Sequence, residues 1–291
     1  MKSNTLIKIV PLLTLFAFVV GVIRAKEDAK PLRVLLVAGG CCHDYPGQSK
    51  LLKTGIESRI KANVTVEFNP DKSTDALFKS YEKDNWADKY DVILHDECSA
   101  SVKDKVYVKR ILDAHRKGTP AVNVHCAMHS YRWGEFREPV KPGDDNAGWY
   151  EMLGIQSTGH GPQAPIDIKY EDKSHPVSTG LKNWTTINEE LYNNVQVFDS
   201  AHVLAKGTQI QKPRKKKGKK ADPNAKAKEV TSVVTWTNEY GPNKTRIFST
   251  TIGHNTETVI DDRYLDLVTR GLLWATKNIK DDGSPAEGYG R

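Results

Sequence analysis

Short apolar runs alternate with helix-like segments through the first half of the chain. The runs cover residues 33–38, 90–95 and 121–125, and helical patterns occupy residues 48–60 and 102–117. Near-continuous apolar runs are typical of strands that are buried on both faces of a parallel sheet. Parallel neighbours need right-handed crossover connections, which helices between the runs supply. The pattern therefore predicts a mainly parallel sheet with helices on both faces.

The second half of the chain contains mostly strand-like segments, and these predict antiparallel additions to the same sheet. They cover residues 164–170, 195–198, 203–205, 230–235 and 246–251, and an amphipathic helix is expected over residues 263–278. The fold class expected is α/β, as a flavodoxin-like three-layer sandwich with a mainly parallel central sheet and added antiparallel strands. One domain over residues 32–280 is long enough to bury a full core.

The N-terminal 25 residues have the pattern of an export signal. Lys2 and Lys8 precede an apolar stretch over residues 9–23, and Ala25 offers a small residue for cleavage. The apolar stretch is shorter than the roughly 20 residues that a membrane span needs. We expect an exported protein, periplasmic or extracellular, with no stable membrane span after cleavage. An uncleaved N-terminal anchor is the alternative.

The net charge of +7 comes from one segment. Residues 212–229 carry nine basic and two acidic residues, so the rest of the mature chain is slightly acidic. The high isoelectric point therefore does not describe a nucleic-acid-binding surface, and no nucleic-acid partner is expected. We interpret residues 212–229 as a disordered lysine-rich insertion. Contact of this insertion with anionic surfaces is the functional alternative.

The four cysteines are too few for a disulfide scaffold. Cys41 and Cys42 are adjacent and are predicted not to pair with each other. Free buried thiols are the expected state. In an oxidising compartment, a bond from Cys98 or Cys126 to one of the adjacent cysteines is the alternative.

Histidine and carboxylate residues follow the predicted parallel strands at the point where each strand ends. His43 and Asp44 follow the first run, His95-Asp96-Glu97 ends the second, and His125 with His129 follows the third. The carboxyl ends of parallel strands meet at one edge of the sheet, where open α/β sheets bind ligands. These strand ends therefore predict a pocket, against the alternative that each histidine is a satisfied structural group.

Further candidates lie in the second half of the chain. His160 lies between two glycines, Glu189 and Glu190 precede Tyr192, and His254 follows the strand-like residues 246–251. Such a set suits a divalent metal such as zinc, and it equally suits general acid–base chemistry on a sugar without a metal. No compact ligand spacing such as HExxH is present. The candidate catalytic residues are His125, Glu190 and His160. The candidate substrate-binding residues are His43, Asp44, His129, Tyr192 and His254. The candidate metal ligands are His43, His125, His160 and His254.

Several stretches together resemble the ThuA-like (trehalose utilisation) family, which has a class I glutamine-amidotransferase-like fold. They cover residues 33–44, 118–129, 175–181, 189–192, 246–254 and 270–277. The resemblance implies a sugar-related role. In amidotransferases a nucleophilic cysteine occupies the sharp turn after a strand, whereas here His125 is expected at that turn and Cys126 comes one residue later. Glutaminase activity is therefore not expected, and Cys126 as a nucleophile with His160 or Glu190 is an alternative.

Three functional hypotheses follow. The first is an enzyme that acts on a carbohydrate or oxidised sugar by hydrolysis, isomerisation or elimination, with or without a metal. The second is a non-catalytic carbohydrate-binding module that uses the same cleft. The third is an interaction protein whose lysine-rich insertion docks on an acidic partner. The first two share a small carbohydrate as the expected ligand.

Overall fold

The computed structural model of the protein describes residues 29–212 and 226–291. The predicted export signal, residues 1–25, and most of the lysine-rich insertion, residues 213–225, lie outside these described residues. Within the described part of the chain, no helix has both the length and the apolar character that a membrane crossing requires.

A nine-stranded sheet forms the centre of the molecule, with the strand order β2-β1-β3-β4-β11-β10-β9-β6-β7. Its first five strands are parallel to one another. They are β2 (Ala62–Asn69), β1 (Leu32–Gly40), β3 (Val92–Cys98), β4 (Ala121–Val124) and β11 (Thr245–Thr250). The predicted parallel sheet is therefore confirmed, and the apolar runs form its most buried strands.

The remaining strands extend this sheet with antiparallel pairs, as expected from the second half of the sequence. They are β10 (Lys228–Tyr240), β9 (Ala201–Gln211), β6 (His160–Tyr170) and β7 (Trp184–Tyr192). Strand β7 was not among the strands expected from the sequence. A separate two-stranded ribbon pairs β5 (Ile155–Gln156) with β8 (Gln196–Val197). The first two residues of β10 belong to the predicted lysine-rich insertion.

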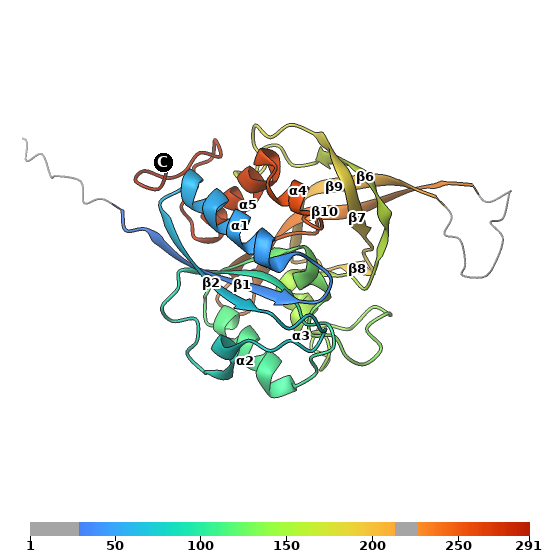
Figure 1. Cartoon of the computed structure of the whole chain (residues 1–291), viewed down its shortest axis with the longest axis horizontal. Helices are drawn as coiled ribbons and strands as arrows, with labels where there is room; N and C mark the ends of the chain where they lie inside the picture. The colour runs from blue at the N-terminus through green and yellow to red at the C-terminus, as the bar shows by residue number, and fades with distance from the viewer. Residues whose placement is uncertain (1–28, 213–225) are drawn as a thin grey trace, which may run out of the picture.

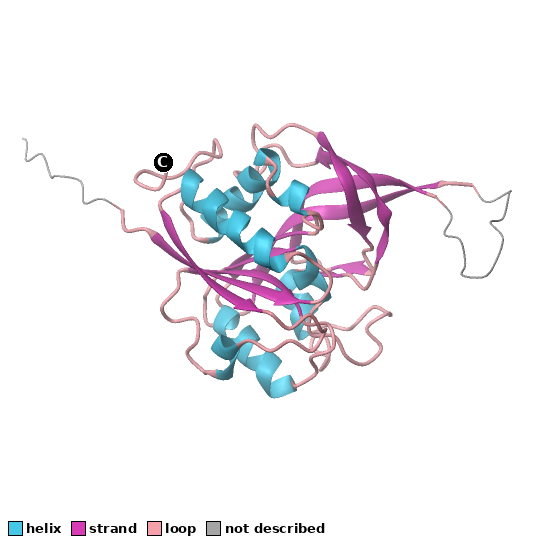
Figure 2. Ribbon diagram, viewed as in Figure 1, coloured by secondary structure: helices cyan, strands magenta, loops and turns pink. Residues whose placement is uncertain are grey.

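Helices cover both faces of the parallel strands (Figures 1 and 2). On one face lie α1 (Tyr45–Arg59), α4 (Thr256–Val259) and α5 (Asp262–Ala275). On the other face lie α2 (Lys105–Arg116) and α3 (Gly148–Leu153). Short 3₁₀ turns occupy Lys79–Glu82 (η1) and His125–His129 (η2). The three-layer sandwich expected from the sequence is confirmed.

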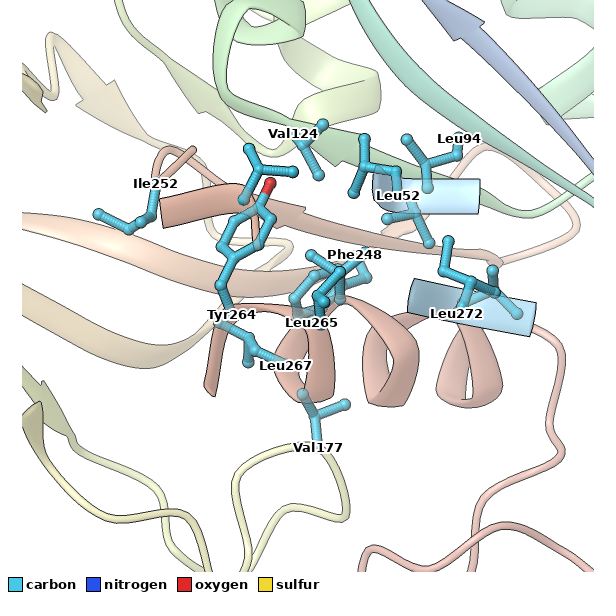
Figure 3. Close-up of a cluster of buried hydrophobic side chains, with 14 of the residues drawn as sticks. Leu52, Leu94, Val124, Val177, Phe248, Ile252, Tyr264, Leu265, Leu267 and Leu272 are labelled. Atoms are coloured by element: carbon cyan, nitrogen blue, oxygen red, sulfur yellow. The ribbon is translucent and has the colours of Figure 1, made fainter. Parts of the chain in front are cut away.

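Each face of the sheet has its own apolar core, and β1 shows why. Val34 and Leu36 pack under α1 and α5, whereas Leu35 and Val37 pack towards α2 and α3. This follows from the period of two in a strand, which sends successive side chains to opposite faces. We call the core between the sheet and helices α1 and α5 the first core. Figure 3 shows it, with Phe248 of β11 against the apolar side of α5.

Candidate functional site

His125 occupies the turn at the end of β4, in the position where the sequence predicted it. Its backbone φ of 40° lies in the left-handed region, which is unusual for a residue other than glycine and is common at functional sites. Its Nδ1 lies 2.7 Å from the carbonyl oxygen of Thr251, so Nδ1 carries the proton and donates it. The Nε2 lone pair then faces the hydroxyl of Tyr192 at 3.1 Å. This second contact points the basic nitrogen of His125 into the site.

Two further imidazoles surround His125, and they come from the ends of β1 and β11. The ring centroid of His43 lies 4.7 Å from that of His125 and 4.7 Å from that of His254. The centroids of His125 and His254 are 5.3 Å apart. The prediction that parallel strand ends would gather distant histidines is confirmed for these three residues.

Glu190 of β7 completes the group. Its Oε2 lies 3.8 Å from Nε2 of His125 and 3.3 Å from Nδ1 of His254. Its other oxygen, Oε1, lies 3.4 Å from Nδ1 of His160. Strand β7 is at the far edge of the sheet, but the antiparallel half turns away from the plane of the parallel strands (Figure 1). This bend brings the end of β7 over the strand ends of the parallel half.

The environment sets the charges of the group. Burial, together with the neighbouring imidazoles, lowers the pKa of His43 to about 3. Burial also lowers the pKa of His125 to about 4. Burial alone would raise the pKa of Glu190, but the hydrogen bond from His254 and the charges of nearby histidines bring it down to about 2. For His254, burial lowers the pKa and the Glu190 carboxylate raises it, and the net shift is upward. Near neutral pH the site therefore holds two neutral imidazoles beside one carboxylate.

Two residues that the sequence did not single out as ligands hold His254 in place. The carboxylate of Glu189 accepts hydrogen bonds from the backbone N–H groups of His254 and Asn255, at 3.0 and 3.2 Å. The side-chain amide of Gln163 lies 2.7 Å from Nε2 of His254. Gln163 is directly opposite Glu190 in the β6–β7 pair. Only the strand register reveals its role, and no sequence motif marks it.

Three other predicted site residues lie around the group in different roles. His160 is exposed, stacks on Tyr192 with centroids 5.9 Å apart, and places its Nδ1 3.4 Å from Oε1 of Glu190. His129 is buried and stacks face to face on Tyr192, with ring centroids 4.1 Å apart. The carboxylate of Asp44 accepts a hydrogen bond from the backbone N–H of Gly47 and caps α1.

The end of β3 does not deliver His95 or Glu97 to the pocket, which corrects the expectation from the sequence. Strand β3 continues to Cys98, so these two side chains lie inside the sheet and point towards α2. His95 lies 2.9 Å from Glu97 and 3.0 Å from His115, and all three side chains are fully buried. The predicted strand ended at residue 95, and a period of two then places residues 95 and 97 on the same inner face.

The cysteines also differ from the prediction. Cys41 and Cys42 are joined by a disulfide, and a backbone φ of 88° at Cys42 accompanies this tight turn. Among the described residues, Cys98 and Cys126 form no disulfide, and both are buried. The Sγ of Cys126 lies 2.8 Å from Nε2 of His43, so this thiol borders the histidine group.

Cavities flank the group on two sides. A cavity of about 610 Å³ is bordered by His160, Tyr192 and Asn193, with Lys226 and Lys228 on its rim. A second, of about 430 Å³, borders His43 and His254. A larger one of about 750 Å³ lies at the amino ends of β1 and β4, at the opposite end of the sheet from the histidines. A ligand in either of the first two would meet imidazole side chains.

The arrangement fits the donor set of a divalent cation. One donor atom each from His125, Glu190 and His254 lies within 4.8 Å of the other two, and the same holds for His43, His125 and Cys126. Tetrahedral zinc with bonds of about 2.0–2.3 Å separates its ligand atoms by roughly 3.3–3.8 Å. Within the described part of the chain, Nδ1 of His43 is buried without a hydrogen-bond partner. A buried imidazole nitrogen of this kind is available to a cation.

Comparison with known proteins agrees with the fold. Crystal structures of ThuA-like proteins from Parabacteroides merdae and Bacteroides uniformis match at a TM-score of 0.55 each. The first is 20% identical over 88% of this chain and 97% of its own, and the second is 14% identical over 86% and 95%. Among curated proteins, none matches this chain significantly. The sequence model of the ThuA family, described as trehalose utilisation, matches residues 33–275. The chain therefore belongs to the ThuA family.

Proposed function

We propose that this ThuA protein is a metal-assisted enzyme that acts on a carbohydrate or an oxidised sugar. The proposal rests on one observation. Donor atoms of His125, Glu190 and His254 lie within 4.8 Å of one another, and the His43 ring lies against the rings of both histidines. The family description, trehalose utilisation, supports a sugar as the substrate class. The cavities beside the group are bordered by polar side chains and one tyrosine ring, which suit a polyhydroxylated ligand.

The protonation states of the side chains determine which role each can take. His125 and Glu190 act as ligands or bases, because their lowered pKa values leave both unprotonated near neutral pH. A bound divalent cation supplies Lewis-acid polarisation of a sugar oxygen or an activated water. His160 faces the 610 Å³ cavity from beside Oε1 of Glu190, so it is the group placed to exchange protons with a ligand there. Hydrolysis, isomerisation and elimination of a sugar can each use a base and a proton donor of this kind.

Turnover separates this proposal from a carbohydrate-binding module that uses the same cleft. The full chain, loaded with zinc, manganese or cobalt, is incubated with trehalose and other disaccharides and with their keto derivatives, and products are followed by mass spectrometry. The enzyme predicts product from at least one sugar, with loss of turnover in His125→Ala and Glu190→Gln. The matched control is His202→Gln, because His202 is an exposed imidazole that pairs with Asp172 outside the site. Saturable sugar binding without product in any metal form would instead identify a binding module.

We also propose that the protein is exported, on the basis of the charged start and apolar stretch in residues 1–25. Mass spectrometry of the protein from its native cells tests this directly. A mature N-terminus near Lys26 in the periplasmic or extracellular fraction is expected. An intact Met1 in the cytoplasmic fraction would contradict export.

A further inference from the structure

The sulfur atoms of Cys41, Cys42 and Cys98 form a cluster in which all three lie within 4.8 Å of one another. Cys42 is exposed and is bonded to Cys41, which is half-buried. The Sγ of Cys41 lies 3.6 Å from the Sγ of Cys98, a buried thiol in the last position of β3. Because Cys41 is already oxidised, only the Cys98 S–H can donate in this contact. The thiol is therefore in contact with the inner sulfur of the disulfide.

The backbone allows a bond between these two positions. Gly40 pairs directly with Cys98 in the parallel ladder between β1 and β3, so Cys41 is the next residue along the neighbouring strand. Adjacent strands lie about 4.8 Å apart, and disulfides join Cα atoms that are about 4.4–6.8 Å apart. Cys42 is an exposed residue, so its sulfur can be solvated by water when it leaves as a thiolate.

We propose that this cluster is a thiol–disulfide exchange site, in which the Cys98 sulfur attacks Cys41 and releases Cys42. The new Cys98–Cys41 bond forms as the Cys41–Cys42 bond breaks, and the proton that leaves Cys98 is taken up by Cys42. The exchange conserves one disulfide and two thiols among the four cysteines, so it needs no oxidant or reductant. In the exchanged form, the exposed Cys42 thiol becomes the point at which an external low-molecular-weight thiol or disulfide reacts.

The exchange also changes the backbone restraint next to His43, because His43 directly follows Cys42 in the chain. In the vicinal disulfide, Cys42 is held at a φ of 88°, and release of its sulfur removes that restraint. Because His43 contacts His125, His254 and Cys126, the exchange alters the mobility of one side of the metal site. This consequence rests on the proposed function, whereas the exchange itself does not.

Disulfide mapping of two serine variants tests the exchange. Full-length Cys42→Ser and Cys41→Ser are incubated with oxidised glutathione, which accepts the two electrons of any new bond, and are then denatured, labelled with a maleimide and digested for mass spectrometry. Cys42→Ser is expected to form a Cys41–Cys98 bond, because these sulfurs are already in contact. Cys41→Ser is the matched control and is expected to form less of a Cys42–Cys98 bond, because Cys42 is one residue further along the chain from the Gly40–Cys98 pair, although all three sulfurs lie within 4.8 Å of one another. A Cys42→Ser protein that stays fully reduced, or variants that crosslink equally, would overturn the proposal.

The wild type provides a second measurement that does not depend on how the variants fold. Mapping after labelling in denaturant is expected to find molecules with Cys42 labelled and Cys98 bonded to Cys41, and Cys98→Ser is expected to abolish the label on Cys42. A wild type in which Cys42 is never labelled would contradict the exchange. Neither measurement involves a metal or a sugar, so failure here is distinguishable from failure of the proposed function.

Discussion

Oε2 of Glu190 lies 3.3 Å from Nδ1 of His254, although the two residues belong to opposite halves of the sheet. Glu190 comes from the outermost antiparallel strand, and His254 follows the last parallel strand. The contact therefore exists only because the antiparallel half turns back over the parallel half. It joins a carboxylate whose pKa is lowered to an imidazole whose pKa is raised. A divalent cation can take the place of the proton that lies between two such side chains.

Glu190→Gln is predicted to lower the pKa of His254, because the hydrogen bond and charge of the carboxylate are what raise it. The substitution keeps the shape of the side chain and removes only the charge. An NMR titration of the imidazole protons measures the pKa directly in the metal-free protein. Glu171→Gln, which removes an exposed carboxylate beside Lys206, serves as the control. An unchanged His254 pKa in Glu190→Gln would contradict the geometry.

Tyr192→Phe is predicted to reduce turnover by about 100-fold while leaving the free energy of unfolding within about 1 kcal/mol of the wild type. The hydroxyl contacts Nε2 of His125, whereas the ring keeps its stack on His129. Steady-state kinetics and urea denaturation measure the two effects. The control is Tyr150→Phe, because within the described chain the Tyr150 hydroxyl is buried without a partner. Equal kinetics in the two variants would exclude a role for the Tyr192 hydroxyl.

Gly271→Ala is predicted to destabilise the fold by about 1–3 kcal/mol, because overpacking a core forces side chains from their preferred rotamers. An added Cβ at this position of α5 would lie 2.2 Å from the ring of Phe248, which Figure 3 shows in the first core. Urea denaturation measures the loss. Gly159→Ala is the matched control, since a Cβ there meets no atom of the described chain within 4 Å. Similar stabilities for the two variants would show that α5 does not pack so tightly on β11.

The stability of the fold is predicted to fall as the pH drops, partly through His115. Burial lowers the pKa of His115 to about 3 in the folded state, against about 6.5 in an unfolded chain. Between these values the unfolded state binds the extra proton. The contribution of His115 to the free energy of unfolding is therefore fully present above about pH 6.5 and is lost progressively as the pH falls below that value. From about pH 7 to pH 5, this single group costs about 2 kcal/mol.

His115→Gln removes this titration, so its free energy of unfolding is expected to change less between the two pH values than that of the wild type. Urea denaturation at both pH values measures the difference. A His115→Gln protein with the same pH dependence as the wild type would show that His115 does not titrate in this way.

Much of the parallel half was predictable, because apolar runs indicate buried strands. The carboxyl ends of parallel strands always meet at one edge of the sheet, so the sequence alone placed His43, His125 and His254 together. The arrival of Glu190 could not be derived in the same way, because it depends on the register of the β6–β7 pair and on the bend of the sheet. His95 was misplaced because the run of apolar residues ended before the strand did. The Cys41–Cys42 bond accompanies a left-handed backbone conformation at Cys42, and no pattern of residues predicts that conformation.

The most direct test of the proposed metal site is a titration of the chelator-treated full chain with zinc, followed by isothermal calorimetry and checked by elemental analysis after dialysis. If the proposal holds, the wild type binds one zinc ion per chain saturably near neutral pH. His125→Ala and Glu190→Gln lose that binding, and His202→Gln retains it. Absence of saturable binding by the wild type, or equal binding by the wild type and His125→Ala, would contradict it.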